Sequence, residues 1–288
     1  MTPAPTLEWS AAALQAELQA LQPGLAVEVL AEDASTNTTL LARARQAGGN
    51  GAAWLLVAEH QSAGRGRMGR AWYAARGDSL TFSLGLRRAT VQGSGLSLAV
   101  GVALAEALDP SGRSIGLKWP NDLWLRGTQP GSGRKLGGIL IETASAERGR
   151  VCVVGVGLNV RAPGAPAGAP AGREGREGQP AFATGVAGLC EIDEQASAPR
   201  VLRRVAEPLL RAWLRFEREG LAPFLGAFEA RDLLRGQRVT TTLAGLPTGT
   251  AIGVDADGAL RVRDEAGRLH RVSAGEVSVR PERAAEAA

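Results

Sequence analysis

The sequence predicts an α+β protein with a mixed sheet, flanking helices and a second, smaller β domain. Two observations support this class. Strand and helix patterns follow one another irregularly up to about residue 235, whereas a doubly wound sheet needs a regular strand–helix–strand repeat. From Arg238 to Arg280 the helical patterns stop, and turn residues separate short strand-like runs. We therefore expect a main domain at residues 1–235 and a C-terminal domain at residues 236–282.

The first third of the chain is predicted to contain two helices and three strands. Apolar residues between Ser10 and Leu21 follow a helical period, with Ser10 as the N-cap and Pro23-Gly24 beyond the end. A second helix is expected to begin at Ser35-Thr36-Asn37 and to end near Gly48-Gly49. The expected strands are Leu25–Leu30, Ala53–Ala58 and Ser79–Leu86. In the last of these, apolar and polar residues alternate, which predicts one buried and one exposed face.

The middle of the chain is predicted to hold one helix and four strands. The helix runs from about Ser94 to Leu108 and ends at Asp109-Pro110. We expect a hairpin turn at Gly127–Gly133. The Pro-, Gly- and Ala-rich stretch Arg161–Pro180 has no apolar period and predicts a mobile loop. The four strands are Leu117–Trp119, Leu123–Leu125, Leu136–Ile141 and Val151–Val156.

A helix-rich stretch precedes the C-terminal domain. It runs from Pro199 to about Asp232, and Pro208 is expected to kink or divide it. Beyond it, Asp257-Gly258 and Gly267 are the turn signals between short strands. The C-terminal domain, at roughly 45 residues, has the size of an SH3-like barrel.

The composition excludes several classes of protein. With 44% hydrophobic and 22% charged residues, the chain can bury a core and should be globular. No apolar run approaches the ~18 residues of a membrane span, and no basic region precedes an apolar segment at the N-terminus. Two cysteines and two histidines cannot form a common Cys/His zinc site. We expect a cytoplasmic protein without a structural metal or a membrane segment.

Lysine is rare in this chain. Of the 33 basic residues, Lys118 and Lys135 are the two lysines, and the other 31 are arginines. Arginine and lysine interchange easily on a solvated surface but not where a compact ammonium is required. Both lysines are therefore candidates for a binding site. Charges of both signs are mixed along the chain, and the net charge is only +4, so no dedicated nucleic-acid-binding face is expected.

The strongest local signal is the glycine- and arginine-rich stretch Gly64–Trp72. It contains G-x-G-x-x-G, but neither the helix nor the acidic residue of a dinucleotide-binding turn follows, and no Gly-Lys-Ser/Thr makes it a Walker A loop. Its glycines let backbone N–H groups converge on an anion, and Arg65, Arg67 and Arg70 can grip a carboxylate or phosphate. The regular spacing favours an anion site over a solvated basic loop.

Lys118-Trp119-Pro120-Asn121-Asp122 follows a predicted strand and has two interpretations. Lys118 could hold a phosphate, while Asn121 and Asp122 hold Mg²⁺ or its waters. Pro-Asn-Asp is also an ordinary turn sequence, and Trp119 could simply belong to the core.

Three other stretches also have a structural and a functional interpretation on their residues alone, and for Ser35-Thr36-Asn37 the structural one is favoured. Lys135–Glu142 is a glycine-bearing strand that a ligand could approach closely, or a β-bulge with a solvated lysine. Gly155–Val160 is a second such strand and carries one amide side chain, that of Asn159. Ser35-Thr36-Asn37 is explained by a helix N-cap, although its spare hydroxyls could equally hold a polar ligand.

These stretches in this order resemble the biotin–protein ligases, which attach biotin to carboxylase carrier domains. The resemblance extends from Ser35 through the C-terminal β domain, roughly residues 30 to 280. It implies a catalytic domain related to the class II aminoacyl-tRNA synthetases, followed by an SH3-like barrel. It also implies two half-reactions: biotin and ATP form biotinyl-5′-AMP and pyrophosphate, and a lysine of the carrier then displaces AMP.

The resemblance assigns roles residue by residue. It implies a biotin site of Ser35, Thr36, Asn37, Gln61, Arg65, Gly66, Arg67 and Lys135. It implies an ATP site of Arg67, Arg70, Trp72, Lys118, Asn121 and Asn159. Lys135 and Arg67 would be catalytic, and Asp122 is a candidate on the Mg²⁺ side. ATP and biotin are the implied substrates, and the implied partner is the biotin carboxyl carrier protein or domain of acetyl-CoA carboxylase or a related carboxylase. A monomer or a homodimer would serve this chemistry.

Two departures and two rival functions accompany the resemblance. Some members carry an N-terminal helix-turn-helix domain, and the ~30 residues before Ser35 are too few for one, so no DNA binding is expected. The family's adenine-side loop falls on the low-complexity stretch Arg161–Pro180, so no adenine-stacking residue is assigned. Lipoate–protein ligases share the chemistry, but their Arg-Arg pair before a triple glycine is missing here. A non-catalytic biotin-binding regulator would not need Lys135 and the arginine loop.

Overall fold

The computed structural model describes residues 7–46, 53–88, 95–128, 132–145, 149–162, 185–243, 245–246, 248–274 and 279–281. The chain divides into two compact units. The first comprises Met1–Gln92 and Leu136–Arg211, and the second comprises Gly93–Lys135 and Ala212–Ala288. The boundary expected near residue 235 remains a prediction.

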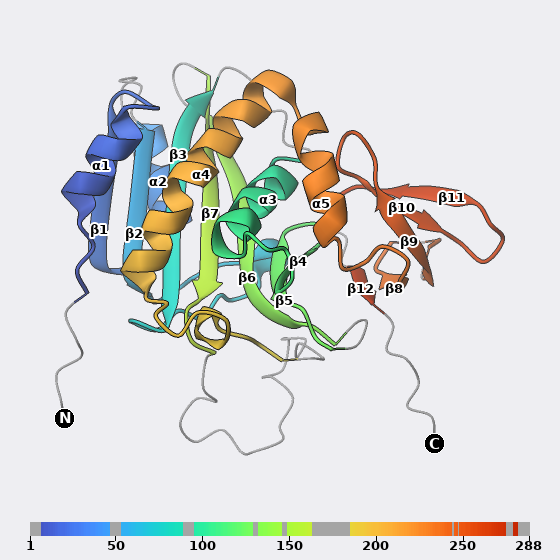
Figure 1. The fold of residues 1–288 in the computed structure, drawn as a ribbon. Helices are drawn as coiled ribbons and strands as arrows, with labels where there is room; N and C mark the ends of the chain where they lie inside the picture. Colours follow the sequence, from blue (N-terminus) through green and yellow to red (C-terminus); the bar gives the residue numbers. More distant parts are fainter. Residues whose placement is uncertain are drawn as a thin grey trace. The chain divides into compact units, whose positions relative to one another are not determined.

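The first unit is built on a mixed sheet (Figure 1). Its strands follow the order β1-β2-β3-β7-β6. β1 and β2 are parallel, and each later neighbour is antiparallel, as the irregular pattern of the sequence predicts. The bounds are β1 Leu25–Asp33, β2 Ala53–Gln61, β3 Ser79–Arg88, β6 Arg134–Ser145 and β7 Arg150–Asn159.

Helices α1 (Ala11–Gln19) and α2 (Thr36–Gln46) belong to the first unit. The apolar face of α2, with Leu40, Leu41 and Ala44, packs on buried residues of β2, β6 and β7. α1 begins where expected, but Ser10 does not cap it. The Ser10 backbone is left-handed, with a φ of 48°, and the Ser10 hydroxyl makes no capping hydrogen bond.

Strand β3 is buried on both faces, so the prediction of an exposed polar face is wrong. Thr81 is 2% exposed and Ser83 is fully buried. The Thr81 hydroxyl donates to the Ala58 carbonyl, and the Ser83 hydroxyl is hydrogen-bonded to side chains at the start of α2. The polar residues of β3 therefore face partners in the protein rather than water.

The second unit holds a buried helix, α3 (Leu96–Leu108), and an antiparallel strand pair, β4 (Ile115–Lys118) and β5 (Asp122–Leu125). In the strand order of the larger sheet, β5 and β4 come after β6, whose first two residues belong to this unit. Trp119, in the turn between β4 and β5, is buried, and its indole donates to the Gly258 carbonyl at 2.9 Å.

Pro208 does not divide the long helix, so this part of the prediction is wrong. α4 runs without interruption through Ala198–Glu219. The helical path ends at Gly220, whose φ of +68° is readily adopted only by glycine. A short 3₁₀ turn at Ala222–Phe224 and helix α5 (Leu225–Arg231) follow.

The C-terminal residues form a separate antiparallel sheet in the second unit, with strand order β11-β10-β9-β8-β12. The predicted turns are confirmed, since Gly258 and Gly267 have φ values of +83° and +82°. The strands are β8 Arg238–Thr241, β9 Thr248–Val254, β10 Leu260–Arg263, β11 Leu269–Val272 and β12 Val279–Pro281.

Three predictions fall wholly or partly outside the described residues. They are the end of the second helix at Gly48-Gly49, part of the turn at Gly127–Gly133 and most of the loop at Arg161–Pro180. None of the helices in the described part of the chain is long and apolar enough to cross a membrane.

Candidate functional site

Five polar residues of the first unit form a continuous chain of hydrogen bonds, which we call the Thr36 network. Its members are Thr36, Asn37, Gln61, Ser83 and Glu142. The Thr36 N–H donates to Gln61 Oε1 at 2.8 Å, so a side chain from β2 caps the first turn of α2. The Thr36 hydroxyl lies 2.6 Å from the Ser83 hydroxyl. The network joins α2, β2, β3 and β6.

Asn37 is the centre of this network. Its Nδ2 donates to Glu142 Oε2 at 2.8 Å, and its Oδ1 accepts from Ser83 at 2.6 Å. The side chain lies directly over Gly155 of β7, where an added Cβ would come within 2.8 Å of Asn37 Cγ. Glycine at position 155 therefore makes room for the amide, and both Asn37 and Thr36 are more than nine-tenths buried.

The glycine- and arginine-rich loop is a tight hairpin. The Gly66 N–H donates to the Arg70 carbonyl at 2.7 Å, and the Trp72 N–H donates to the Gly64 carbonyl at 2.8 Å. The tip is a 3₁₀ turn at Arg67–Gly69, in which Met68 has a left-handed backbone. Arg65 and Arg70 are exposed and Arg67 is half-buried, so the loop carries three guanidinium groups on a compact turn.

Trp72 leaves this hairpin and packs on the sheet. A Cβ on Gly157 would lie 2.6 Å from Trp72 Cζ2, so the indole ring occupies the space that the glycine leaves open on β7. The buried indole Nε1 has no hydrogen-bond partner among the described residues. Asn159, at the end of the same strand, is 3% exposed.

The glycines of β6 allow a close approach between two backbones. A Cβ on Gly137 would lie 2.6 Å from the Gly157 carbonyl oxygen. The pairing of β6 with β7 keeps one register from Gly137 to Ser145, so these residues form no β-bulge against β7.

In the second unit, two lysines flank one carboxylate. Lys135 Nζ lies 2.7 Å from Asp122 Oδ1, and each side chain is 14% exposed. The β4–β5 register places Lys118 directly opposite Asp122, and the Lys118 ammonium lies 5.5 Å from the centre of the Trp124 ring. Burial raises the pKa of Asp122, but Lys135 and Lys118 outweigh it and hold that pKa below its ordinary value. Asp122 is therefore an anion at neutral pH.

Asn121 and Trp119 lie in the turn between these strands, so the interpretation of this stretch as a turn is correct. The same turn sets Lys118 and Asp122 opposite each other. Within the described part of the chain, no group of three or more His, Cys, Asp or Glu residues could hold a metal ion.

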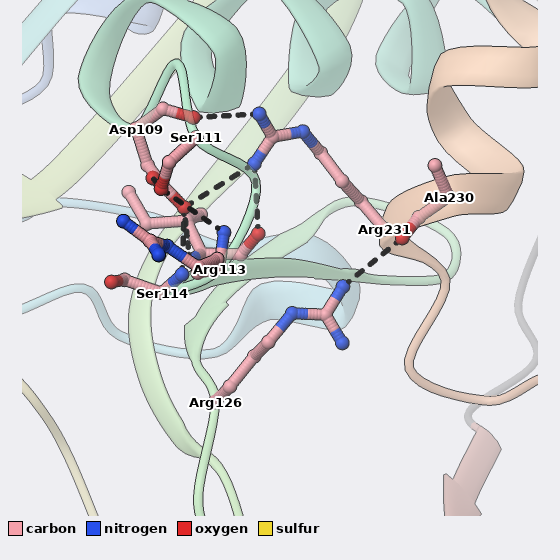
Figure 2. A network of polar contacts seen from close by, with 8 residues as sticks. Asp109, Ser111, Arg113, Ser114, Arg126, Ala230 and Arg231 are labelled. Carbon is pink, nitrogen blue, oxygen red and sulfur yellow. Dashed lines mark hydrogen bonds and ion pairs between the residues drawn. The ribbon is translucent and has the colours of Figure 1, made fainter.

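A buried charge network anchors β4, the strand that ends at Lys118 (Figure 2). Arg231 donates to the Asp109 carbonyl at 2.6 Å and to the Ile115 carbonyl at 3.1 Å. The Asp109 carboxylate accepts from the backbone N–H groups of Ser114 and Ile115, each at 2.8 Å. Burial raises the pKa of Asp109, but the hydrogen bond from Ser111, the two backbone bonds and the positive charge of Arg231 lower it to about 2.

Asp232, next to Arg231, behaves in the opposite way. Burial raises its pKa from 3.8 to about 6, and Oδ2 has no hydrogen-bond partner among the described residues. A carboxyl group with a raised pKa favours the folded state at low pH, and this contribution is lost as the pH rises from about 4 to 6. Asp232→Asn keeps an acceptor for the Leu234 N–H and removes the ionisation.

We therefore expect Asp232→Asn to increase the free energy of unfolding at pH 7.5 by on the order of 1 kcal/mol, after allowance for partial exposure. Denaturant unfolding at pH 4.5 and 7.5 measures this. The difference between wild type and variant should be smaller at pH 4.5. An equal difference at both pH values would show that the carboxyl group does not titrate as proposed.

The structure brings together several of the predicted site residues. Thr36, Asn37 and Gln61 share one network, with Ser35 buried beside Thr36 in the chain. The loop carries Arg65, Gly66, Arg67 and Arg70, and Lys135 pairs with Asp122. Sequence reasoning missed Ser83 and Glu142. The alternation in its strand predicts a solvent-facing Ser83, and Glu142 gives no signal beyond ending the Lys135–Glu142 stretch.

Comparison with known proteins gives consistent matches. Residues 29–159 match the model of the biotin/lipoate A/B protein ligase family, and residues 235–280 match that of the biotin protein ligase C-terminal domain. The chain is 36% identical to a biotin–[acetyl-CoA-carboxylase] ligase from Mycobacterium tuberculosis, over 87% of this chain and 88% of that protein. It is 33% identical to the bifunctional ligase/repressor BirA of Escherichia coli, over 89% of this chain and 75% of that protein. Among solved structures, a biotin protein ligase from Aquifex aeolicus in complex with biotin and ATP matches with a TM-score of 0.68 and 27% identity, covering 89% of this chain and 99% of that one.

Proposed function

Because the chain belongs to the biotin protein ligase family, we propose that it joins biotin to a carrier protein in two steps. An oxygen of the biotin carboxylate attacks the α-phosphorus of ATP, and pyrophosphate leaves. The ε-amine of a carrier lysine then attacks the acyl carbonyl of biotinyl-5′-AMP, AMP leaves, and the amine loses a proton. The observation that best supports this chemistry is the Lys135 ammonium, fixed by Asp122 at the start of a glycine-bearing strand.

We assign the ring of biotin to the Thr36 network. A cyclic urea has two N–H donors and one carbonyl acceptor, so it needs a site with fixed donors and acceptors. The hydroxyl of Thr36 and the amide of Gln61 supply both kinds of group, and both are already oriented by other residues. Ser35, Asn37, Arg65 and Gly66 complete the proposed biotin site.

The phosphate side requires positive charge rather than a protein nucleophile, because the reaction joins two anions. We propose that Lys135 contacts the biotin carboxylate and the α-phosphate and that Arg67 stabilises the charge that develops between them. Lys135 precedes Gly137 by two residues on β6, and Gly137 lies opposite Leu158 of β7. The lysine proposed to contact the phosphate therefore lies on the same strand as the glycines that pair with β7. The remaining proposed ATP contacts are Arg70, Trp72, Lys118, Asn121 and Asn159.

Mg²⁺ commonly accompanies ATP, held by phosphates and one or two carboxylates. Asp122 fits such a role in charge and in its place beside Lys118, although Oδ1 accepts from Lys135. We propose Asp122 as the carboxylate nearest the Mg²⁺ ion. The ion would contribute by neutralising negative charge on the phosphates.

The finer features that the resemblance implies remain proposals. They are a main domain like that of class II aminoacyl-tRNA synthetases, an SH3-like barrel for the five-stranded C-terminal sheet, and a carrier from acetyl-CoA carboxylase or a related enzyme. Cytoplasmic location and a monomeric or homodimeric state belong with them.

Biotin-dependent exchange of labelled pyrophosphate into ATP tests the function directly, with lipoate and octanoate run in parallel. We expect exchange with biotin alone. Exchange with lipoate alone would replace the proposed substrate and keep the chemistry. No exchange from folded protein that binds biotin would make it a non-catalytic binding protein.

A further inference from the structure

A buried carboxylate holds the segment that follows the arginine-rich hairpin, and we propose that it positions this hairpin on biotinyl-5′-AMP. The carboxylate belongs to Glu59 of β2, and it forms an ion pair with Arg76. Glu59 is then a positioning residue, which acts on the intermediate through the hairpin Gly64–Trp72 and not by contact. This inference rests on the proposed function, because that function places residues of the hairpin in both the biotin site and the ATP site.

Glu59 uses both of its carboxylate oxygens. Oε1 accepts from the Trp9 indole N–H at 2.8 Å, and Oε2 lies 2.7 Å from Arg76 Nε. Glu59 is 7% exposed and Trp9 is 8% exposed, whereas the Arg76 side chain is 46% exposed. A carboxylate that is nearly removed from water needs both a compensating charge and hydrogen bonds. Arg76 supplies the charge, and Trp9 satisfies the other oxygen.

Arg76 lies in the segment between the hairpin and β3, residues 73–78, which we call the return arm. The backbone of this arm is held on either side of Arg76. Ala74 forms an antiparallel bridge with Gln61, and the Asp78 carbonyl accepts from two backbone N–H groups that follow β7. The ion pair adds a third anchor between these two. Because side chains make it, this anchor can be removed without changing the backbone.

The return arm determines where the hairpin lies. Backbone hydrogen bonds join the two sides of the hairpin at Gly64 and Trp72 and again near its tip. The hairpin therefore moves as one body, and a shift of the return arm displaces both Arg67 at the tip and Trp72 at the base. Both residues are assigned to contacts with the substrates, so a loosened arm should hold biotinyl-5′-AMP less tightly.

Glu59→Gln removes one of the two contacts selectively. An amide has one acceptor oxygen where a carboxylate has two, so the variant can satisfy either Trp9 or Arg76 but not both. The Trp9 indole is buried, whereas Arg76 is half-exposed and can turn to water. Leaving the buried donor unsatisfied costs more, so the amide oxygen stays with Trp9. The variant therefore releases the return arm.

The test is the rate at which biotinyl-5′-AMP leaves the enzyme. Labelled intermediate is formed on the protein from labelled biotin and ATP, separated from free substrates and chased with unlabelled biotinyl-5′-AMP. We expect release to be about fivefold to tenfold faster from Glu59→Gln and from Arg76→Met than from the wild type, within the effect of one lost hydrogen bond to a charged group. Both changes remove the same contact, so Glu59→Gln/Arg76→Met should be no faster than the faster single variant.

A second double variant should restore the contact. In Glu59→Gln/Arg76→Gln, the amide introduced at position 76 is attached to Cδ, the atom that carries Nε in arginine. Its oxygen can therefore accept from the amide nitrogen introduced at position 59, while Trp9 keeps its acceptor. We expect this variant to release biotinyl-5′-AMP more slowly than Glu59→Gln, at a rate close to that of the wild type.

Arg203→Met is the matched control for the loss of an ion pair. The Arg203 side chain is 43% exposed and lies 2.9 Å from Glu17, so the substitution removes a similarly exposed arginine from a carboxylate of the same unit. Arg203 is on α4 and makes no contact with the return arm in the described residues. Release from this variant should equal that from the wild type.

Each result decides the proposal. Wild-type release from either single variant would overturn it, as would additive effects in Glu59→Gln/Arg76→Met, no recovery in Glu59→Gln/Arg76→Gln, or faster release from Arg203→Met. If Glu59→Gln does not fold, as judged by thermal unfolding, Arg76→Met decides in its place, because its side chain is half-exposed. Wild-type protein that forms no biotinyl-5′-AMP from biotin and ATP would instead refute the proposed function on which the inference rests.

Discussion

Replacing Lys135 by alanine is expected to slow biotin-dependent pyrophosphate exchange by about 10²–10³-fold, the usual cost of losing one charge-stabilising donor at a transition state. The ammonium is fixed before any substrate binds, since its side chain is 14% exposed and Nζ lies 2.7 Å from Asp122. A positioned cation needs little reorganisation when charge moves from carboxylate to phosphate. Exchange rates of variant and wild type at saturating biotin and ATP measure the loss.

A structural explanation of the same loss can be separated from the chemical one. Removing Lys135 deprives Asp122 of a partner that lowers its pKa, so the pKa of this carboxyl should rise. If the damage came from an unpaired carboxylate that destabilises the fold, Lys135→Ala would lower the free energy of unfolding, and Lys135→Ala/Asp122→Asn would restore it. We expect Lys135→Ala to lose exchange activity while its folded fraction under assay conditions, measured by denaturant unfolding, stays close to that of the wild type. Lys135→Arg provides a second control: partial activity would show that charge suffices, and none would show that the compact ammonium is required.

Much of this architecture could be predicted because it depends on local signals. The turn glycines at 258 and 267, the helix end beyond Leu108 and the separate C-terminal sheet all follow from residues with restricted or permissive backbones. The loop arginines stand out because glycines are interleaved with them, and the two lysines stand out because lysine is rare in this chain.

The incorrect predictions for Ser83 and Pro208 have another cause, because contacts between distant parts of the chain decide both. Ser83 is one of the alternating polar residues of its strand, which normally indicate an exposed face, but its partners come from a helix 46 residues earlier in the chain. Pro208 has a strong local tendency to interrupt a helix, yet tertiary packing keeps α4 continuous, with Leu209 and Leu210 buried immediately after it. Side-chain pairing between distant elements, which positions Glu142 on Asn37, leaves no trace in a single sequence.

The second large effect is expected at the base of β4. Arg231→Met should reduce the free energy of unfolding by about 3–5 kcal/mol, the usual cost of breaking a buried ion pair by removing one partner. Arg231 and Asp109 are 5% and 7% exposed, and Arg231 holds both the Asp109 and the Ile115 carbonyls. Arg211→Met removes an exposed ion pair on α4 and should cost less than about 1 kcal/mol. Denaturant unfolding of both variants gives the comparison.

Acid unfolding tests the role of Asp109 in the same loss. Its pKa of about 2 lies below the ordinary 3.8, so its ionised form stabilises the fold above about pH 4, and this contribution disappears as the pH falls toward 2. Without Arg231 the pKa of Asp109 should rise and the pH dependence should weaken. Arg231→Met/Asp109→Asn should then be more stable than Arg231→Met, because the double variant leaves no uncompensated charge. If the double variant were no more stable, the lost stability would lie in the two backbone hydrogen bonds of Arg231, and β4 would be held in place by those bonds rather than by the ion pair.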